Sequence, residues 1–242
     1  MDVTLKRTNV ILGDFHNMII NGNYTAIFYD DYHVVGEEKE KGTVMEFVYF
    51  KDYGKELGTG VVVGWGGTKG NSFNFMRSFQ EEDQKMVQDE KIKLILNYKI
   101  PSSTNLHEKY PILYPVEYLD TTTANKFIEI ILEGFDKWNT GIEEYINWLS
   151  TGYTDDALSY GLEGEKRTME EYKIAMQTLV KTKTIEKLYF YNILIRDKWA
   201  AIHYVYRIEE ESGTKDEGDR MQFLQFKKIE ENSFKIVASW IK

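Results

Sequence analysis

Two stretches of the chain share one pattern. Residues 15–29 read FHNMIINGNYTAIFY, and residues 190–204 read FYNILIRDKWAAIHY. Six of the fifteen aligned positions are identical at a constant offset of 175 residues. Both stretches are rich in β-branched and aromatic residues and are interrupted by a short polar turn, at residues 21–23 and 196–198. This pattern is typical of a β-hairpin.

The similarity extends beyond the two hairpins. Residues 45–51 match residues 221–227 after a one-residue gap, with four of seven identical, and residues 61–65 match residues 236–240. Twelve of 27 aligned positions are identical, whereas unrelated sequences of ordinary composition would share roughly two. We interpret this as an internal repeat; the alternative is that two β-rich segments resemble each other by composition alone. Each copy predicts an antiparallel meander of about four strands.

Helical sequence precedes the second copy. Three threonines at residues 121–123 offer N-caps, and Gly141 stands where a C-terminal glycine cap belongs. Between them, apolar residues recur at helical spacing: Phe127, Ile131, Phe135 and Trp138. A second helix is predicted over residues 142–149, and Thr168 with Glu171 forms a capping box that begins a third helix.

Residues 121–242 therefore read as two helices, a short strand, a helix and four long strands. This order resembles the NTF2-like superfamily, and the sequence is also similar to its SnoaL-like branch. The resemblance is carried by Trp148, Gly152 and Tyr153 after the second helix, the helix from Thr168, the turn at residues 196–198 and the closing segment 235–240. It implies an α+β fold, in which a curved antiparallel sheet wraps on helices into a cone with a pocket at its open end. A second, helix-poor copy of the sheet would lie N-terminal to it.

The two copies are unequal. The first begins at about residue 3 and has no helices before it, so we predict a partial NTF2-like, β-rich domain at residues 1–100, a linker at 101–120 and a complete domain at 121–242. The apolar concave face of the first sheet needs a cover, which residues 66–100, the second domain or another chain could provide. Because family members commonly pair sheet against sheet, the resemblance implies an internal pseudo-dimer or a homodimer through sheet faces.

The segment after the first copy contains two further predicted elements. Residues 81–90 favour a helix, and residues 91–100 alternate between apolar and polar side chains, which indicates a strand. The glycine-rich run at residues 64–70 lacks the spacing of a phosphate-binding loop, so we interpret it as a connection between strands.

Composition excludes several classes of function. The net charge of −9 disfavours nucleic-acid binding. The chain has no cysteine, which excludes disulfides, thiol nucleophiles and thiolate metal sites. No apolar run is long enough for a signal peptide core or a membrane span, so we expect a soluble, cytoplasmic protein. No two histidines have the spacing of metal ligands, and the sequence predicts no metal site and no cofactor.

Three residues are candidates for proton transfer. His203 stands in a central strand where the first copy has Phe28, so it could act as an acid or base in a pocket, or lie on the opposite face of the sheet. Asp155 and Asp156 follow the short strand after Tyr153, where they could act in a dry pocket or simply lie in a solvated turn. The resemblance implies such a pocket group, because family enzymes of the isomerase, dehydratase and cyclase types use a carboxylate or histidine.

Aromatic residues of the predicted cone are the candidates for ligand binding. They are Trp138, Tyr153, Tyr172, Tyr191, His203, Tyr204, Phe223 and Trp240. Each could stack on a flat ligand or simply pack in the core. Two function classes follow: a protein that binds a small hydrophobic molecule or serves as a dimerisation or interaction module, and a SnoaL-like enzyme that uses His203 or an aspartate as the base.

Overall fold

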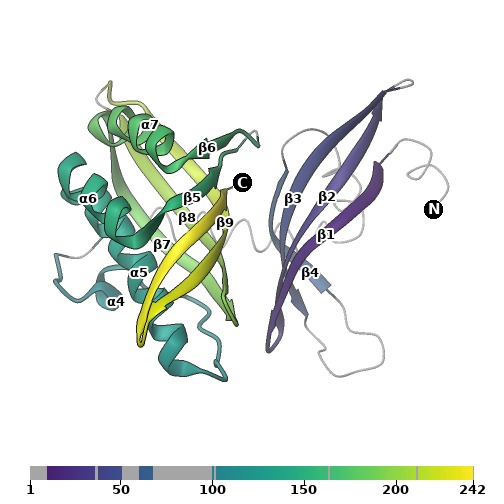
Figure 1. Cartoon of the computed structure of the whole chain (residues 1–242), viewed down its shortest axis with the longest axis horizontal. Helices are drawn as coiled ribbons and strands as arrows, with labels where there is room; N and C mark the ends of the chain where they lie inside the picture. The colour runs from purple at the N-terminus through teal and green to yellow at the C-terminus, as the bar shows by residue number, and fades with distance from the viewer. Residues whose placement is uncertain are drawn as a thin grey trace.

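The fold contains two β-sheets and a group of helices on one face of the larger sheet (Figure 1). The computed structural model describes residues 10–35, 38–50, 60–67, 100, 102–162, 164–210 and 212–241. The predicted helix at residues 81–90 and, apart from Ile100, the predicted strand at residues 91–100 lie outside the described residues. The predicted α+β class is confirmed.

The N-terminal sheet is a four-stranded meander. Its strands are β1 (Val10–Asn21), β2 (Tyr24–Val35), β3 (Glu38–Phe50) and β4 (Gly60–Gly67). Neighbours along the chain are neighbours in the sheet, and all pairs are antiparallel. The meander predicted from the first copy is therefore present.

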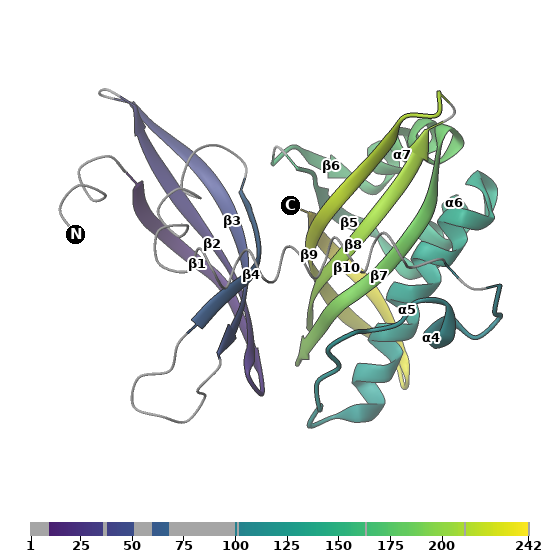
Figure 2. The same cartoon turned by 180° about the vertical axis from the view of Figure 1, so that it is seen from behind.

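The second unit, which we call the cone, combines helices with a six-stranded sheet. In chain order its elements are α4 (Leu106–Lys109), α5 (Thr121–Thr140), α6 (Ile142–Gly152), β5 (Tyr153–Tyr160), β6 (Lys166–Thr168), α7 (Met169–Thr182), β7 (Lys183–Arg196), β8 (Trp199–Glu210), β9 (Lys215–Glu230) and β10 (Ser233–Ile241). The strand order is β6-β5-β10-β9-β8-β7, and only the β5–β10 pair is parallel among these strands. Figure 2 shows the curved sheet wrapping around the helices.

Local sequence signals set the ends of the helices. The capping box at Thr168 is formed as predicted: its hydroxyl accepts from the backbone N–H of Glu171, whose carboxylate accepts from the backbone N–H of Thr168. Gly141 ends α5 with a φ of 144°, as expected of a glycine in that position. The N-cap of α5 is Asp120, not one of the three threonines after it, because its carboxylate accepts from the backbone N–H of Thr123.

The two hairpins share their register. In each, the strand ladder shifts between the same aligned positions, Phe15 and Asn17 in β1 and Phe190 and Asn192 in β7. An irregularity of this kind bends a strand locally, so both strands bend at the same point. The first turn residue has a positive φ in both hairpins, 54° at Gly22 and 53° at the aligned Asp197. The similarity of the two segments therefore extends from sequence to backbone geometry.

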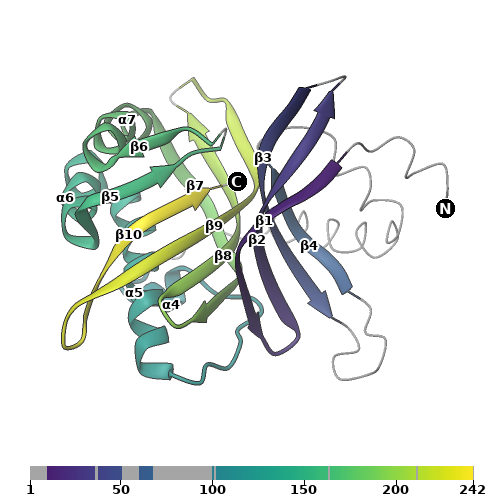
Figure 3. The same cartoon turned by 45° about the vertical axis from the view of Figure 1, so that its right-hand side comes forward.

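An apolar layer lies between the two sheets, and we call it the inter-sheet core. The sheets face each other in every view, most clearly in Figures 1 and 3. The N-terminal sheet contributes Ile19, Ala26, Phe28, Met45 and Phe47, and the cone contributes Tyr191, Leu194, Ala201, Met221 and Phe223. A separate core lies inside the cone, between its helices and the inner face of its sheet. The central strand β8 is therefore buried on both faces.

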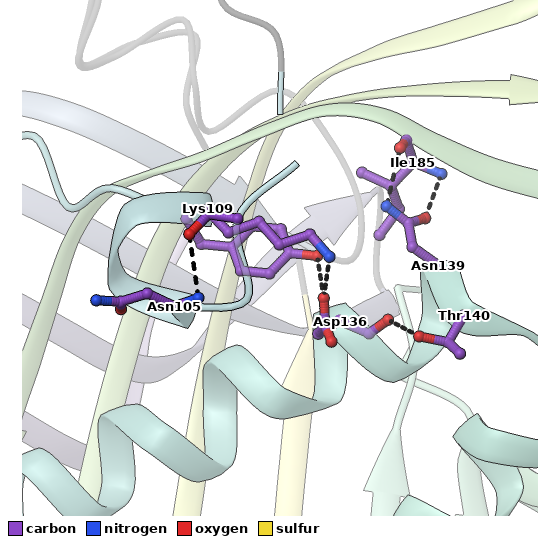
Figure 4. A network of polar contacts seen from close by, with 8 residues as sticks. Asn105, Lys109, Asp136, Asn139, Thr140 and Ile185 are labelled. Atoms are coloured by element: carbon purple, nitrogen blue, oxygen red, sulfur yellow. Dashed lines mark hydrogen bonds and ion pairs between the residues drawn. The ribbon is translucent and has the colours of Figure 1, made fainter. Parts of the chain in front are cut away.

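A polar network fixes α5 against the edge of the cone sheet (Figure 4). Asn139 brackets the backbone of Ile185 in β7: its Nδ2 donates to the carbonyl at 3.0 Å, and its Oδ1 accepts from the N–H at 3.0 Å. One turn earlier, Asp136 pairs with Lys109 and accepts a hydrogen bond from the hydroxyl of Tyr110. The two hydrogen bonds of Asn139 therefore occupy backbone groups of the edge strand β7, and Asp136 fixes the α4 segment to α5.

Part of the predicted linker lies along β7. Residues 111–114 lie along that edge strand, where the N–H of Leu113 donates to the carbonyl of Phe190 at 2.9 Å. The N–H of Tyr114 likewise donates to the carbonyl of Tyr191 at 3.0 Å. The chain therefore reaches α5 by an extended path that covers the open edge of the cone sheet.

Candidate functional site

A cavity of about 440 Å³ lies inside the cone. Helices α5, α6 and α7 and every strand of the cone sheet contribute to its lining, and the lining residues that the structure describes fall within residues 131–241. The volume is in the range of small-molecule sites, roughly 300–1,000 Å³. The cavity reaches the surface near the loop between β5 and β6, because Leu162 and Glu165 of this loop and Arg167 of β6 line the cavity and are partly exposed.

Aromatic rings make up much of the cavity wall. Tyr145 stacks on Trp148 with ring centroids 5.6 Å apart, and Trp148 meets Tyr153 edge-on at 5.6 Å. Phe135 of α5 meets Tyr204 of β8 edge-on at 5.0 Å across the interior. Rings in such arrangements stabilise one another beyond their buried area, so this wall is a rigid surface suited to a flat ligand.

Gly134 of α5 makes this packing possible. A Cβ atom added to Gly134 would lie 2.5 Å from Cζ2 and Cη2 of Trp148, closer than carbon atoms can approach. The indole of Trp148 therefore lies directly on the backbone of α5. The indole Nε1 of Trp148 is buried and has no hydrogen-bond acceptor among the described residues.

Several tyrosine hydroxyls reach the cavity region. The hydroxyl of Tyr145 interacts with that of Tyr172, and the hydroxyl of Tyr153 lies near Ser239, so that each neighbour influences the pKa of the tyrosine. Burial raises the pKa of each of these tyrosines, and it raises the pKa of Tyr204 although the nearby Arg220 opposes the effect. The hydroxyls therefore stay protonated at neutral pH and can donate hydrogen bonds to a ligand.

Few charged side chains line the cavity. Glu165 is the one carboxylate among the described lining residues, and it pairs with Arg167 at 3.0 Å. Lys183 pairs with Glu210 at 2.8 Å. The guanidinium of Arg220 lies over the ring of Tyr206, 5.1 Å from its centroid.

Four of the predicted ligand-binding residues line this cavity: Trp138, Tyr153, Tyr172 and Tyr204. The other four do not. The outer face of the cone sheet carries Tyr191, His203 and Phe223. Tyr191 and Phe223 are part of the inter-sheet core, and Trp240 packs against that core. Successive residues of a strand point to opposite faces, which is why adjacent residues such as His203 and Tyr204 are separated.

The three predicted proton-transfer residues lie outside the cavity. His203 is fully buried with its ring 5.3 Å from Phe47 and 4.9 Å from Tyr191, so it faces the N-terminal sheet. This is the opposite-face placement that the sequence left open. Asp155 and Asp156 are exposed on β5 and do not line the cavity.

Sequence reasoning did not propose Arg220, Gln222, Arg167 or Glu165 as site residues, although all four line the cavity. A signal existed for two of them. Arg220 and Gln222 alternate with Met221 along β9, so they share a face that the apolar neighbour does not. Polar residues on one face of a strand are usually predicted to face solvent. A polar cavity wall has the same pattern and is therefore missed.

Metal sites and membrane-spanning helices each set requirements for the described part of the chain. No group of three or more His, Cys, Asp or Glu side chains within it could hold a metal ion. Among the described helices, none combines the length and the apolar character that crossing a membrane requires.

Comparisons with known proteins give structural relatives only. No protein-family model matches the sequence, and no curated protein matches it significantly. A ketosteroid isomerase-like protein from Erwinia carotovora atroseptica shares 11% identity at a TM-score of 0.39, over 51% of this chain and 96% of its own. A Catenulispora acidiphila protein with a ketosteroid isomerase-like fold, solved in complex with trimethylamine, shares 13% identity at a TM-score of 0.38. The match covers 47% of this chain and 84% of that protein. An NTF2-like protein of unknown function from Pseudomonas putida shares 10% identity at a TM-score of 0.38, and the match covers 52% of this chain and 89% of that protein.

Proposed function

We propose that the cone binds a small, flat, mainly apolar molecule in its interior cavity. The observation that carries this proposal is the cavity of about 440 Å³ whose wall combines packed aromatic rings with buried, protonated tyrosine hydroxyls. Such a lining suits a ring system that stacks on aromatic side chains and presents one or two hydrogen-bond acceptors.

Binding without catalysis is favoured over the enzyme alternative. A general base at neutral pH needs a pKa near 7 and must reach the ligand. The tyrosines of the cavity have raised pKa values, so they stay protonated at neutral pH and cannot accept a proton there. Glu165 is paired with Arg167. His203 faces away from the cavity, and a proton-transfer role for it would need a ligand in the inter-sheet core.

We also propose that the N-terminal sheet acts as a built-in partner, so that the chain forms an internal pseudo-dimer of a partial domain at residues 1–100 and a complete domain at residues 121–242. The supporting observation is a reciprocal pair of contacts. Phe28 stacks on Phe223 at 5.2 Å, and Phe47 meets His203 at 5.3 Å. In the repeat, Phe28 aligns with His203 and Phe47 aligns with Phe223. Reciprocity of this kind is the signature of an interface with two-fold symmetry.

Replacing Ala175 with phenylalanine tests the ligand-binding proposal. Ala175 of α7 lines the cavity, and a phenyl ring there would occupy part of its volume. The matched control is Ile174→Phe, because Ile174 is the preceding residue of the same helix and is 60% exposed.

The measurement is a thermal-shift screen with flat aromatic compounds, followed by titration of tryptophan fluorescence. We expect compounds that stabilise the wild-type chain and Ile174→Phe to lose about tenfold or more in affinity for Ala175→Phe. Equal affinity in all three chains would place binding elsewhere, and no stabilising compound at all would contradict the proposal.

A further inference from the structure

Arg220 has an unusual position among the charged residues of the cone. In the middle of β9, Arg220, Gln222 and Leu224 line the cavity. The intervening Met221 and Phe223 point the other way, into the inter-sheet core. The guanidinium group of Arg220 therefore lies on the cavity face of β9, the same face on which Leu224 contributes apolar lining.

Arg220 has no acidic partner within the described residues. Its contacts there are with tyrosines: it pairs across the strands with Tyr204, and its guanidinium lies over the ring of Tyr206. The other cations of the lining differ, since Arg167 pairs with Glu165 and Lys183 pairs with Glu210. The contrast is notable in a chain that has nine more acidic than basic residues.

Gln222 adds a second donor beside Arg220. It lines the cavity two residues further along the same face, which corresponds to roughly 7 Å along a strand. Its side-chain amide, like the guanidinium of Arg220, makes no hydrogen bond to any residue in the described part of the chain. Two neighbouring polar groups thus face the cavity with hydrogen-bonding capacity that the described residues do not use.

The chemistry of these groups indicates what would complete them. A guanidinium removed from bulk water is stabilised by an anion that accepts its hydrogen bonds, and its planar fork matches the two oxygens of a carboxylate. One unpaired cation balances one negative charge. A phosphate carries up to about two charges and would leave part of its charge unbalanced in an aromatic cavity.

We propose that the ligand of the cone is an aromatic or polycyclic carboxylate, whose carboxylate group is bound by Arg220 with Gln222 donating an additional hydrogen bond. This inference rests on the proposed ligand-binding function and specifies the chemical class of the ligand. The ring system then lies against the wall of Trp148, Tyr145 and Phe135, and the charged group lies towards β9.

Matched pairs of probes separate the charge from the shape of the ligand. The probes are the carboxylic acids of naphthalene, anthracene and pyrene, each with its primary amide, titrated at pH 7.5 by quenching of tryptophan fluorescence. The chains are the wild type, Arg220→Gln, Arg220→Lys and Arg196→Gln. Arg196 is the control because it is exposed at the end of β7 and does not line the cavity.

We expect at least one acid to bind the wild type about 10- to 100-fold more tightly than its amide, as a charge-assisted contact implies. Arg196→Gln should keep this ratio, Arg220→Gln should reduce it to near one, and Arg220→Lys should give an intermediate value because it keeps the charge without the fork. Affinity for the amides should change little in any variant. Raising the salt concentration should weaken acid binding to the wild type more than amide binding.

The outcomes distinguish this inference from the proposed function. If acids and amides bind the wild type equally well, the cone binds ligands but the role of Arg220 is refuted. If no probe binds the wild type, the proposed function fails and this inference fails with it. If Arg220→Gln does not fold, the acid-to-amide ratio of the wild type and of Arg220→Lys still decides the question.

Discussion

Replacing Phe28 with alanine tests whether the two sheets stabilise each other. Phe28 is 2% exposed, and its ring lies 5.2 Å from that of Phe223 and 5.4 Å from that of Trp240. All of these contacts cross from the N-terminal sheet to the cone. Truncation of a fully buried phenylalanine to alanine lowers the free energy of unfolding by about 3–5 kcal/mol, and about 0.5–1.5 kcal/mol of that reflects ring–ring contact.

Urea unfolding followed by tryptophan fluorescence measures the effect on the cone. Four of the five tryptophans lie in residues 121–242, so fluorescence reports mainly on that unit. If the sheets are coupled, Phe28→Ala should lower the fluorescence midpoint by about 1–2.5 M urea, given m-values of about 2–3 kcal/mol/M. Phe15→Ala is the control, because Phe15 is 58% exposed and its loss should change the stability by less than about 1 kcal/mol.

A second variant tests the same contact from the cone side. Phe223→Ala should be about as destabilising as Phe28→Ala, and the double variant should lose less than the sum of the two, because the rings contact each other. An unchanged fluorescence midpoint in Phe28→Ala, with a separate earlier loss of β-sheet signal in circular dichroism, would refute the coupling. The N-terminal sheet would then be an independent unit that merely rests on the cone.

Two further predictions concern the cavity wall. Gly134→Ala should lower the midpoint of thermal unfolding, because the added Cβ would displace the ring of Trp148. Overpacking of this kind costs about 1–3 kcal/mol, and the gain in helix propensity offsets roughly 1 kcal/mol of it. An increased midpoint would contradict the packing described. The free energy of unfolding should also fall as the pH rises above about 10. Above that pH the tyrosines of the unfolded chain lose their protons, whereas Tyr145, Tyr153 and Tyr204 keep theirs in the folded chain because their pKa values are raised. The expected slope is about 1.4 kcal/mol per pH unit for each buried tyrosine. Urea midpoints at pH 9, 10 and 11 measure this slope, and Tyr153→Phe should reduce it. A wild-type stability that stays constant over this pH range would contradict the burial of these hydroxyls.

The sequence predicted the elements of the fold well because their signals are local. The capping box at Thr168 and the cap at Gly141 depend on a few adjacent residues, and each was found where expected. The hairpins are likewise specified by short turns between β-rich runs, and the positive φ of Gly22 and Asp197 accounts for the residue types that those turns contain.

The candidate site was predicted only in part because the choice of sheet face is not a local property. A strand that is buried on one face alternates between apolar and polar residues, and the pattern then identifies the inner face. Residues 199–206 of β8 read WAAIHYVY and are apolar throughout except for His203, because both faces of this strand are covered. Both His203 and Tyr204 were predicted to bind the ligand, although adjacent residues of a strand face opposite sides and cannot share a pocket. The alternation rule does not say which of the two faces the helices.

The covering of both faces of β8 also connects the N-terminal sheet with the cavity. The N-terminal sheet buries the outer face of the cone sheet, where Met221 and Phe223 pack in the inter-sheet core. A sheet without such a cover must bury its apolar residues against its own helices, which favours a filled interior. Here the outer face supplies part of the apolar burial, so the inner face can carry Arg220 and Gln222 and leave space beside them. If this reasoning is correct, weakening the inter-sheet core by Phe28→Ala should reduce ligand affinity as well as stability, although Phe28 does not touch the cavity.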